Sequence, residues 1–421
     1  MAEIQNVPTV VIVDALSTGS FIAPHLKKRG FQCLHVFSSD KMSEHLVEIF
    51  RPQDFIERLT FAGDLEAILA GLTKYDLKLV LAGSEPGVEL ADQLSRRLGL
   101  PSSDTSLSLA RRNKYMMQEN LRARGLRAIR EKFSTKLDEI VAWAESQKAW
   151  PVVLKPVEDA GTEGVHFCNS VAEVTAAYNS IMHHINNLGI ENRAVLAQEK
   201  ISGEECVVNT VSFKGNHYIT DHWKYRKIVA EHSFPIYDYA RLVPHPTHDN
   251  RELARYDADV LDALGFTFGP AHAEIMLTAT GPVLIEVGAR LMGGALNPDY
   301  VTECIGHNQL DLTLDCFLDH QHFLKQAERP YKIIKHCMMK FLIAYQSGKV
   351  AALPGKAIIE KFSSVRQVKI AVKPGERLAK TVDLFTSPGE IILIHHDPEI
   401  LEEDYRRICE LEKQGLFEFS A

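Results

Sequence analysis

Two strand-like segments that each carry one glutamate among apolar residues constrain the fold most. The segments are Ala271–Leu277 and Val283–Val287, with a turn between them. A hairpin centred on Thr280 places Glu274 directly opposite Glu286, with Cβ atoms about 5 Å apart on one face. Two carboxylates buried this close together repel each other unless a cation lies between them.

The facing glutamates therefore predict a divalent metal site. Mg²⁺ prefers carboxylate and phosphate oxygens, so we expect one or two Mg²⁺ ions, with Mn²⁺ as a substitute. An offset strand register is the alternative, in which one glutamate faces solvent. Arg290 follows Glu286 by four residues, and its rigid fork of donors suits a carboxylate or a developing oxyanion. Gly293 and Gly294 leave space beside it.

A charged, glycine-containing loop predicts an anion site. It connects the apolar runs Val152–Leu154 and Val165–Cys168. Gly161 and Gly164 allow backbone amides to point inward and cradle phosphates, and Lys155 can reach the same space. The loop lacks the spacing of a P-loop, and a long surface hairpin explains it equally well.

A short connection between two strands is the second candidate nucleotide contact. It runs from Gln198 through Glu199, Lys200 and Ile201 to Glu205. Its backbone can pair with an adenine edge, and the carboxylate of Glu205 can accept both ribose hydroxyls. A solvated linker is the alternative.

The first hundred residues predict a doubly wound α/β unit. The apolar run Thr9–Val13 is typical of a buried parallel strand, and a turn, a helix over 21–29 and the strand Cys33–Val36 follow. The first turn holds one glycine, Gly19, where a dinucleotide fingerprint has three, so a Rossmann oxidoreductase is disfavoured. Glu85 follows a later strand and is a candidate substrate contact.

The chain has 421 residues, which predicts more than one domain. We expect an N-terminal α/β domain over 1–110, linker helices and a small central lid over 111–202, and a mixed-sheet domain over 203–421. A net charge of −8 disfavours nucleic-acid binding. Seven scattered cysteines, no signal-peptide pattern and no membrane-spanning stretch favour a cytoplasmic protein without a membrane partner. A homodimer is left open.

Taken in order, these segments resemble the ATP-grasp superfamily, and more closely its carboxylate–amine ligases of the L-amino acid ligase type. Bacterial dipeptide synthetases and the ligase domain of carnosine synthase are similar. One departure is Gly288, where many ATP-grasp enzymes have a metal-binding asparagine; dipeptide ligases tolerate this change. The resemblance rests on Asp14–Gly19, Gly83–Gly87, Arg112–Lys114, Lys155-Pro156, Ala160–Val165, Gln198-Glu199 with Gly203–Glu205, and Glu286 with Arg290.

The resemblance implies a role for each matching residue. Lys114, Lys155 and the loop with Gly161, Thr162 and Gly164 would contact the phosphates of ATP. Glu199, Lys200 and Ile201 would hold adenine, and Glu205 would hold the ribose. Glu274 and Glu286 would bind Mg²⁺. Arg290 would stabilise the reacting carboxyl group. Glu85, Trp223, Gly293 and Gly294 are substrate candidates, although packing explains Trp223 better.

The implied activity is the ATP-dependent joining of one amino acid's carboxyl group to the amine of another. An acyl phosphate would be the intermediate, and ADP and phosphate would be released. Three alternatives remain: an ATP-grasp carboxylase, a carboxylate–amine ligase with another acceptor, and a nucleotide-binding regulator without turnover.

Overall fold

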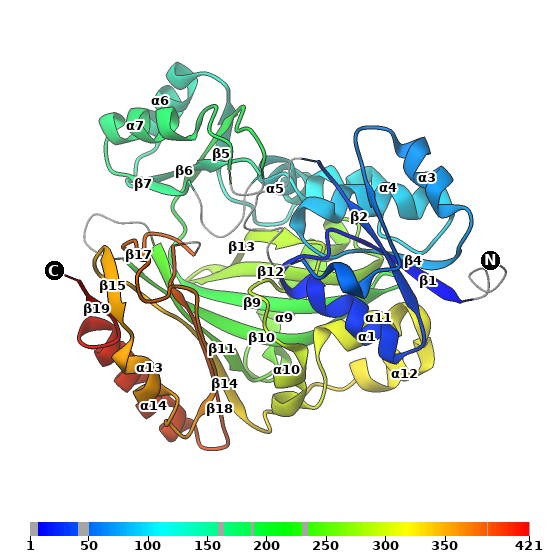
Figure 1. The fold of residues 1–421 in the computed structure, drawn as a ribbon. Helices are drawn as coiled ribbons and strands as arrows, with labels where there is room; N and C mark the ends of the chain where they lie inside the picture. The colour runs from blue at the N-terminus through cyan, green and yellow to red at the C-terminus, as the bar shows by residue number, and fades with distance from the viewer. Residues whose placement is uncertain are drawn as a thin grey trace.

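The computed structural model contains four β-sheets flanked by helices (Figure 1). It describes residues 7–40, 50–158, 164–186, 189–229, 235–384 and 386–420. No helix within these ranges combines the length and the apolar composition that a bilayer crossing requires.

The N-terminal sheet is parallel and has the strand order β3-β2-β1-β4. Alternate residues of β1 are buried on opposite faces of this sheet. Val10 and Ile12 contact α1 residues, whereas Val11 and Val13 pack with α4 residues. This confirms the predicted α/β unit. The elements are β1 (Pro8–Val13), α1 (Ile22–Lys28), β2 (Gln32–Phe37), β3 (Glu57–Thr60), α3 (Leu65–Leu72), β4 (Asp76–Ala82) and α4 (Val88–Leu98).

The turn after β1 packs directly on the turn after β4. A Cβ atom at Gly19 would lie 2.0 Å from the carbonyl oxygen of Gly83, and one at Gly83 would lie 2.5 Å from the carbonyl oxygen of Asp14. Close approach of two backbones therefore explains the lone glycine of the first turn.

A small antiparallel sheet, which we call the lid sheet, has the strand order β5-β8-β6-β7. In Figure 1 it stands above the largest sheet, with α6 and α7 on its outer side. The two helices bury Ile140, Ala144 and Val174 against it. The elements are α5 (Lys114–Ala123), which precedes the sheet, β5 (Glu131–Ser134), α6 (Leu137–Ser146), β6 (Val152–Pro156), β7 (His166–Cys168), α7 (Val171–Ile181) and β8 (Val195–Glu199).

The largest sheet has the strand order β13-β12-β9-β10-β11-β14-β18-β16. All of its pairings among the described strands are antiparallel, whereas we predicted a mixed sheet. Its strands are β9 (Glu204–Phe213), β10 (Asn216–Val229), β11 (Pro235–Val243), β12 (Phe268–Thr278), β13 (Gly281–Gly288), β14 (His336–Phe341), β16 (Val365–Ile370) and β18 (Gly389–His395).

Three of the remaining strands form a separate small sheet with the order β17-β15-β19. The division of the chain at residues 110 and 202 stays a prediction. The elements are α8 (Pro246–Asp249), α9 (Arg251–Ala263), α10 (Pro298–Ile305), α11 (Gln309–Leu318), α12 (His320–Ala327), β15 (Gly348–Ala352), α13 (Pro354–Ile359), β17 (Arg377–Leu378), α14 (Pro398–Lys413) and β19 (Glu418–Phe419).

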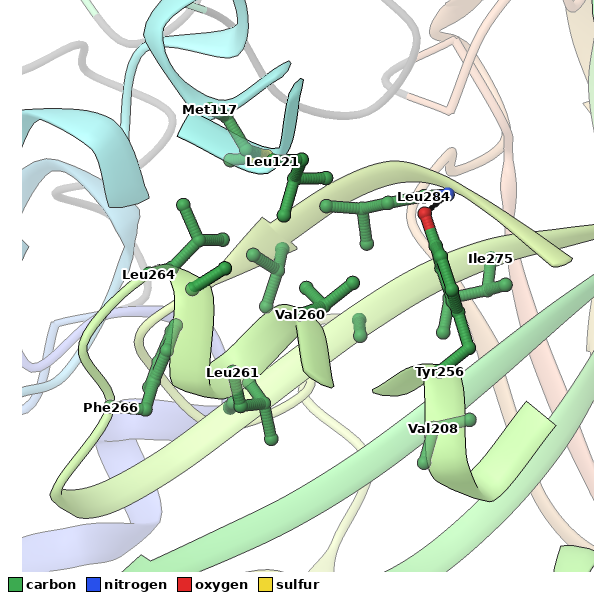
Figure 2. Packing of buried hydrophobic residues seen from close by; sticks show 14 of the residues in the cluster. Met117, Leu121, Val208, Tyr256, Val260, Leu261, Leu264, Phe266, Ile275 and Leu284 are labelled. Carbon is green, nitrogen blue, oxygen red and sulfur yellow. Dashed lines mark hydrogen bonds between the residues drawn. The ribbon is translucent and has the colours of Figure 1, made fainter. Parts of the chain in front are cut away.

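A hydrophobic cluster supports the glutamate hairpin from behind (Figure 2). Val260 and Leu261 of α9 face Ile275 of β12 and Leu284 of β13, and Leu121 of α5 covers the same cluster. All five side chains are fully buried. The cluster therefore holds α5, α9 and the two glutamate-bearing strands in one packed unit.

Replacing Leu261 by alanine should destabilise the protein by about 2–5 kcal/mol, because the lost methyl groups leave a cavity among fixed neighbours. Urea unfolding would measure the change. Asp259→Ala is the matched control, because Asp259 is an exposed residue of the same helix. An unchanged unfolding midpoint for Leu261→Ala would contradict the packing described.

Candidate active site

A cavity of about 730 Å³ lies between the lid sheet and the largest sheet. Its volume falls within the range of about 300–1,000 Å³ that is usual for small-molecule sites. Eight of the predicted site residues line it, drawn from α5, β6, β8, β9, β12, β13 and the β8–β9 connection. They are Lys114, Lys155, Glu199, Lys200, Ile201, Glu205, Glu274 and Glu286.

The two glutamates of the hairpin are paired directly across β12 and β13, as predicted. The predicted turn centre, however, is wrong. Thr278 pairs with Gly281, which leaves a two-residue turn, and this register continues to Ile275 and Leu284. A β-bulge at Ile285 then shifts the register by one residue and brings Glu286 opposite Glu274.

The bulge also changes which side chains face the cavity. Ile285 and Glu286 both line it, although neighbours in a regular strand point to opposite faces. A bulge interrupts the ladder, and here side chains bind the backbone beside it. The hydroxyl of Tyr256 accepts from the N–H of Leu284 at 2.9 Å, and Nε2 of Gln118 donates to the carbonyl of Leu284 at 3.0 Å.

Two lysines compensate the negative charge of the hairpin. Nζ of Lys114 lies 3.0 Å from Oε2 of Glu286, and Lys155 lines the same cavity. Burial raises the pKa of Glu286, but the positive charges of Lys114 and Lys155 outweigh burial and lower this pKa to about 2. Burial raises the pKa of Glu274, against the charge of Lys227.

The hairpin suits a divalent cation that takes its other ligands from a substrate. Burial of Glu274 opposes its ionisation, so a cation beside both carboxylates would relieve the conflict. Within the described ranges, no group of three or more His, Cys, Asp or Glu side chains is arranged to hold a metal. Two carboxylates with phosphate oxygens and water match the usual coordination of Mg²⁺.

The other end of the cavity combines apolar walls with one buried ion pair. Val153, Met276 and Ile285 line it, and these side chains suit a flat, apolar ring. Nζ of Lys227 lies 2.6 Å from Oε1 of Glu205. Burial raises the pKa of Glu205 to about 7, although the charge of Lys227 opposes this.

Sequence reasoning missed Lys227 and Tyr237. Nζ of Lys227 lies 4.3 Å from the ring centre of Tyr237, and both residues line the cavity beside Tyr225. The sequence did carry a signal for the Lys227 position. Trp223, Tyr225 and Lys227 alternate along one strand and so share a face.

The predicted backbone contacts of the β8–β9 connection need one revision. The N–H of Glu199 donates to the carbonyl of Arg130 at 3.0 Å, so this donor is already used. The side chain of Glu199 also pairs with Arg130, at 2.7 Å. Nζ of Lys200 lies over the ring of Phe167 at 5.3 Å, and this contact joins the connection to β7 of the lid sheet.

Arg290 and Glu85 meet, although they are far apart in the sequence. Nε of Arg290 donates to Oε2 of Glu85 at 2.9 Å. Both line a hollow of about 20 Å³ that shares Lys114 and Glu286 with the large cavity. A Cβ atom at Gly288 would lie 2.6 Å from the same carboxylate oxygen and 3.2 Å from Cζ of Arg290. In this arrangement the Arg290–Glu85 pair occupies the space in which a Cβ atom at Gly288 would lie.

The remaining predicted residues lie elsewhere. Trp223 is fully buried and donates from Nε1 to Oδ1 of Asp221. With Gly293 it lines a separate hollow of about 40 Å³. Gly294 adopts a φ of +84°, a conformation that favours glycine. Gly164 closes the predicted phosphate loop with a φ of +66°, while Gly161 and Thr162 lie outside the described residues.

Comparisons with known proteins agree on one family. Residues 148–299 match the model of the ATP-grasp domain. The chain is 35% identical over 421 residues to dapdiamide A synthase of Enterobacter agglomerans. The alignment covers 98% of this chain and 97% of that protein.

Two solved structures share the fold. The L-amino acid ligase from Bacillus licheniformis has a TM-score of 0.76 at 20% identity, covering 99% of this chain and all of that one. Carboxyaminoimidazole ribonucleotide synthase from Aspergillus clavatus, complexed with ATP, has a TM-score of 0.69 at 15% identity, covering 96% of this chain and 98% of that one.

Replacing Lys227 by methionine should destabilise the protein at neutral pH by about 3–5 kcal/mol, because Glu205 is left buried without its partner. Adding Glu205→Gln should recover part of the loss. Arg130→Met is the control, because it breaks a more exposed ion pair of the same site and should cost less than about 1 kcal/mol. Urea unfolding of the wild type, Lys227→Met, Glu205→Gln, the double variant and Arg130→Met would measure these changes, and additive effects of the first two substitutions would rule out the pair.

Proposed function

The chain belongs to the ATP-grasp family of carboxylate–amine ligases, and we propose that it joins the carboxyl group of one amino acid to the amine of another while converting ATP to ADP and phosphate. The observation that carries this proposal is the shared cavity, in which two lysines meet two facing glutamates. This combination suits a polyphosphate with its metal ion better than it suits a neutral ligand.

We assign the phosphates of ATP to the lysine end of the cavity. Lys114 and Lys155 would contact phosphate oxygens, and Glu274 and Glu286 would hold Mg²⁺. When bound, Mg²⁺ would neutralise phosphate charge there. Lys114 now pairs with Glu286 at 3.0 Å, so we expect its ammonium to be shared between this carboxylate and the phosphates.

We assign the nucleoside of ATP to the apolar end. Val153, Met276 and Ile285 would enclose adenine, and the backbone near Lys200 and Ile201 would meet its polar edge. Glu205 would accept the ribose hydroxyls, and the charge of Lys227 would favour the ionised carboxylate against burial. The bound ATP of the Aspergillus clavatus protein supports a nucleotide in this fold.

The reaction needs two bond-forming steps. A substrate carboxylate attacks the γ-phosphorus in line, which forms an acyl phosphate and releases ADP. The amine of the second substrate then attacks the acyl carbon, loses a proton and expels phosphate. Arg290 would meet the oxyanion of this second step, and Glu85 would orient its guanidinium.

The small lid within residues 111–202, which also hold the linker helices, would exclude water from the acyl phosphate, between an N-terminal domain over 1–110 and a catalytic domain over 203–421. The loop with Gly161, Thr162 and Gly164 would cover the phosphates. Trp223, Gly293 and Gly294 stay substrate candidates. The cytoplasmic location and the homodimer stay predictions, as does use of Mn²⁺.

The proposal is tested by incubating the protein with ATP, Mg²⁺ and pairs of amino acids. Phosphate release is measured, and the products are identified by mass spectrometry. A dipeptide mass that requires both amino acids and ATP is expected. Release that requires bicarbonate, or an amine that is not an amino acid, would favour the carboxylase or another carboxylate–amine ligase. ATP binding without release under every condition would favour a regulator.

Replacing Glu286 by glutamine should lower ATP-dependent phosphate release by about 100-fold or more, because one carboxylate of the metal pair is lost while its shape is kept. Glu252→Gln is the matched control, because Glu252 is exposed on α9. Unfolding midpoints would show that both variants fold. Turnover at the wild-type rate in Glu286→Gln would refute the metal assignment.

A further inference from the structure

A β-bulge in β11 turns the side chain of Tyr237 toward the large cavity. Arg226 of β10 pairs with Tyr239, but the next residue, Lys227, pairs with Tyr237, so Asp238 is an extra residue in β11. In a regular strand Tyr237 and Tyr239 would share a face, because side chains alternate. The bulge separates them instead. Tyr239 packs beside α14, whereas Tyr237 lines the large cavity.

Buried polar groups on the α14 side of the sheet hold this bulge in place. Oδ1 of Asp238 lies 3.0 Å from Nζ of Lys340 on β14, and the hydroxyl of Tyr405 on α14 donates to Oδ2 at 2.6 Å. Lys340 is fully buried and also pairs with Glu412 of α14 at 2.8 Å. Breaking a buried ion pair is strongly destabilising. The bulge that turns Tyr237 toward the cavity is therefore a fixed feature of the fold.

The ring of Tyr237 is held on three sides. It meets the rings of Tyr225 and Phe341 edge-on, with ring centres 5.2 and 5.5 Å away. Nζ of Lys227 lies 4.3 Å from the centre of the Tyr237 ring, and this lysine pairs with Glu205 at the nucleoside end of the cavity. These contacts fix the direction of the ring, and with it the position of the hydroxyl.

The hydroxyl of Tyr237 is an unused donor that is open to the cavity. Within the described ranges it has no hydrogen-bond partner. Its oxygen is not one of the completely enclosed polar atoms, so it reaches the cavity that the residue lines. The residue as a whole is only 8% exposed. A hydroxyl at this depth is costly unless a partner reaches it, so we expect a group of the ligand to accept its hydrogen.

The charges around this hydroxyl indicate which ligand group it meets. Burial raises the pKa of Tyr237 well above its usual range, so the phenol is neutral and can donate one hydrogen. Three carboxylates raise this pKa further and one guanidinium lowers it; they belong to Glu274, Glu205, Glu286 and Arg290. Because Glu286 and Arg290 act on the hydroxyl as well as Glu205, it lies on the phosphate side of the nucleoside. An anionic oxygen is the acceptor that suits a donor there.

We propose that Tyr237 is a further substrate-contacting residue, whose hydroxyl donates a hydrogen bond to the terminal phosphoryl group of ATP. The inference rests on the proposed function, which places the triphosphate and its metal ion beside Glu274 and Glu286. ADP lacks the terminal group, so this contact distinguishes the two nucleotides. During the reaction the hydrogen bond stabilises charge on the phosphoryl oxygens while the group passes to the substrate carboxylate.

Calorimetric titrations with two nucleotides in the presence of Mg²⁺ test the inference. One is ADP, and the other is adenosine 5′-(β,γ-imido)triphosphate, which carries a terminal phosphoryl group that resists transfer. Tyr237→Phe removes the hydroxyl and keeps the ring. It should bind ADP like the wild type and the imidotriphosphate about tenfold or more weakly, because a hydrogen bond to a charged group is lost. Tyr239→Phe, on the other face of the same strand, should match the wild type with both nucleotides.

Stability and turnover separate this contact from a structural role. The unfolding midpoint of Tyr237→Phe should equal that of the wild type, because the hydroxyl has no partner within the described ranges. In the ligase assay, its kcat/KM for ATP should fall about tenfold or more. Wild-type affinity for the imidotriphosphate, or an equal loss for both nucleotides, would overturn the inference.

The outcomes for Tyr237 and for the proposed function are distinguishable. A wild type that forms no dipeptide, while Tyr237→Phe still weakens only the imidotriphosphate, would support the contact and overturn the ligase. A wild type that forms a dipeptide, with unchanged nucleotide affinities in Tyr237→Phe, would support the ligase and overturn the contact. A wild type that binds neither nucleotide would overturn both.

Discussion

Repulsion between two carboxylates on neighbouring strands is the constraint on which the site depends. Glu274 and Glu286 face each other across β12 and β13, and burial opposes the charge of both. Lys114 and Lys155 supply the opposing charge, and they come from α5 and β6, outside the largest sheet. The hairpin thus requires the linker helix and the lid sheet to lie close to it, and the space that remains is the large cavity. A site that draws positive charge from two elements outside its own sheet is suited to a ligand that carries negative charge itself.

A second link joins the N-terminal unit to the same strands. Glu85 follows β4, and its carboxylate accepts from Nε of Arg290 at 2.9 Å. The Arg290–Glu85 pair occupies the space in which a Cβ atom at Gly288 would lie. The departure from the usual asparagine therefore accompanies this ion pair. In the proposed ligase, this pair would position the guanidinium that meets the reacting carboxyl group.

Local patterns predicted much of the fold and part of the site. The apolar run of β1 predicted the parallel sheet correctly, because burial on both faces leaves a continuous apolar stretch. The glutamate pairing was also predicted, but from a turn centred on Thr280. The observed turn would have placed Ile285 opposite Glu274, and only the bulge restores the pair. No periodic pattern marks a bulge, and the side chains that bind the backbone beside it, Tyr256 and Gln118, come from distant helices.

By itself, the sequence determined which residue types each segment contributes: a parallel α/β start, a lysine before a glycine-containing loop, and two acidic strands followed by an arginine. Strand periodicity and turn residues are local properties, so they are legible without coordinates. Only the tertiary structure decided which of these groups meet. It paired Lys227 with Glu205 and joined Arg290 to Glu85. The reason is physical: contacts between distant segments depend on sheet order, bulges and packing, and none of these is encoded in the spacing of residues along one strand.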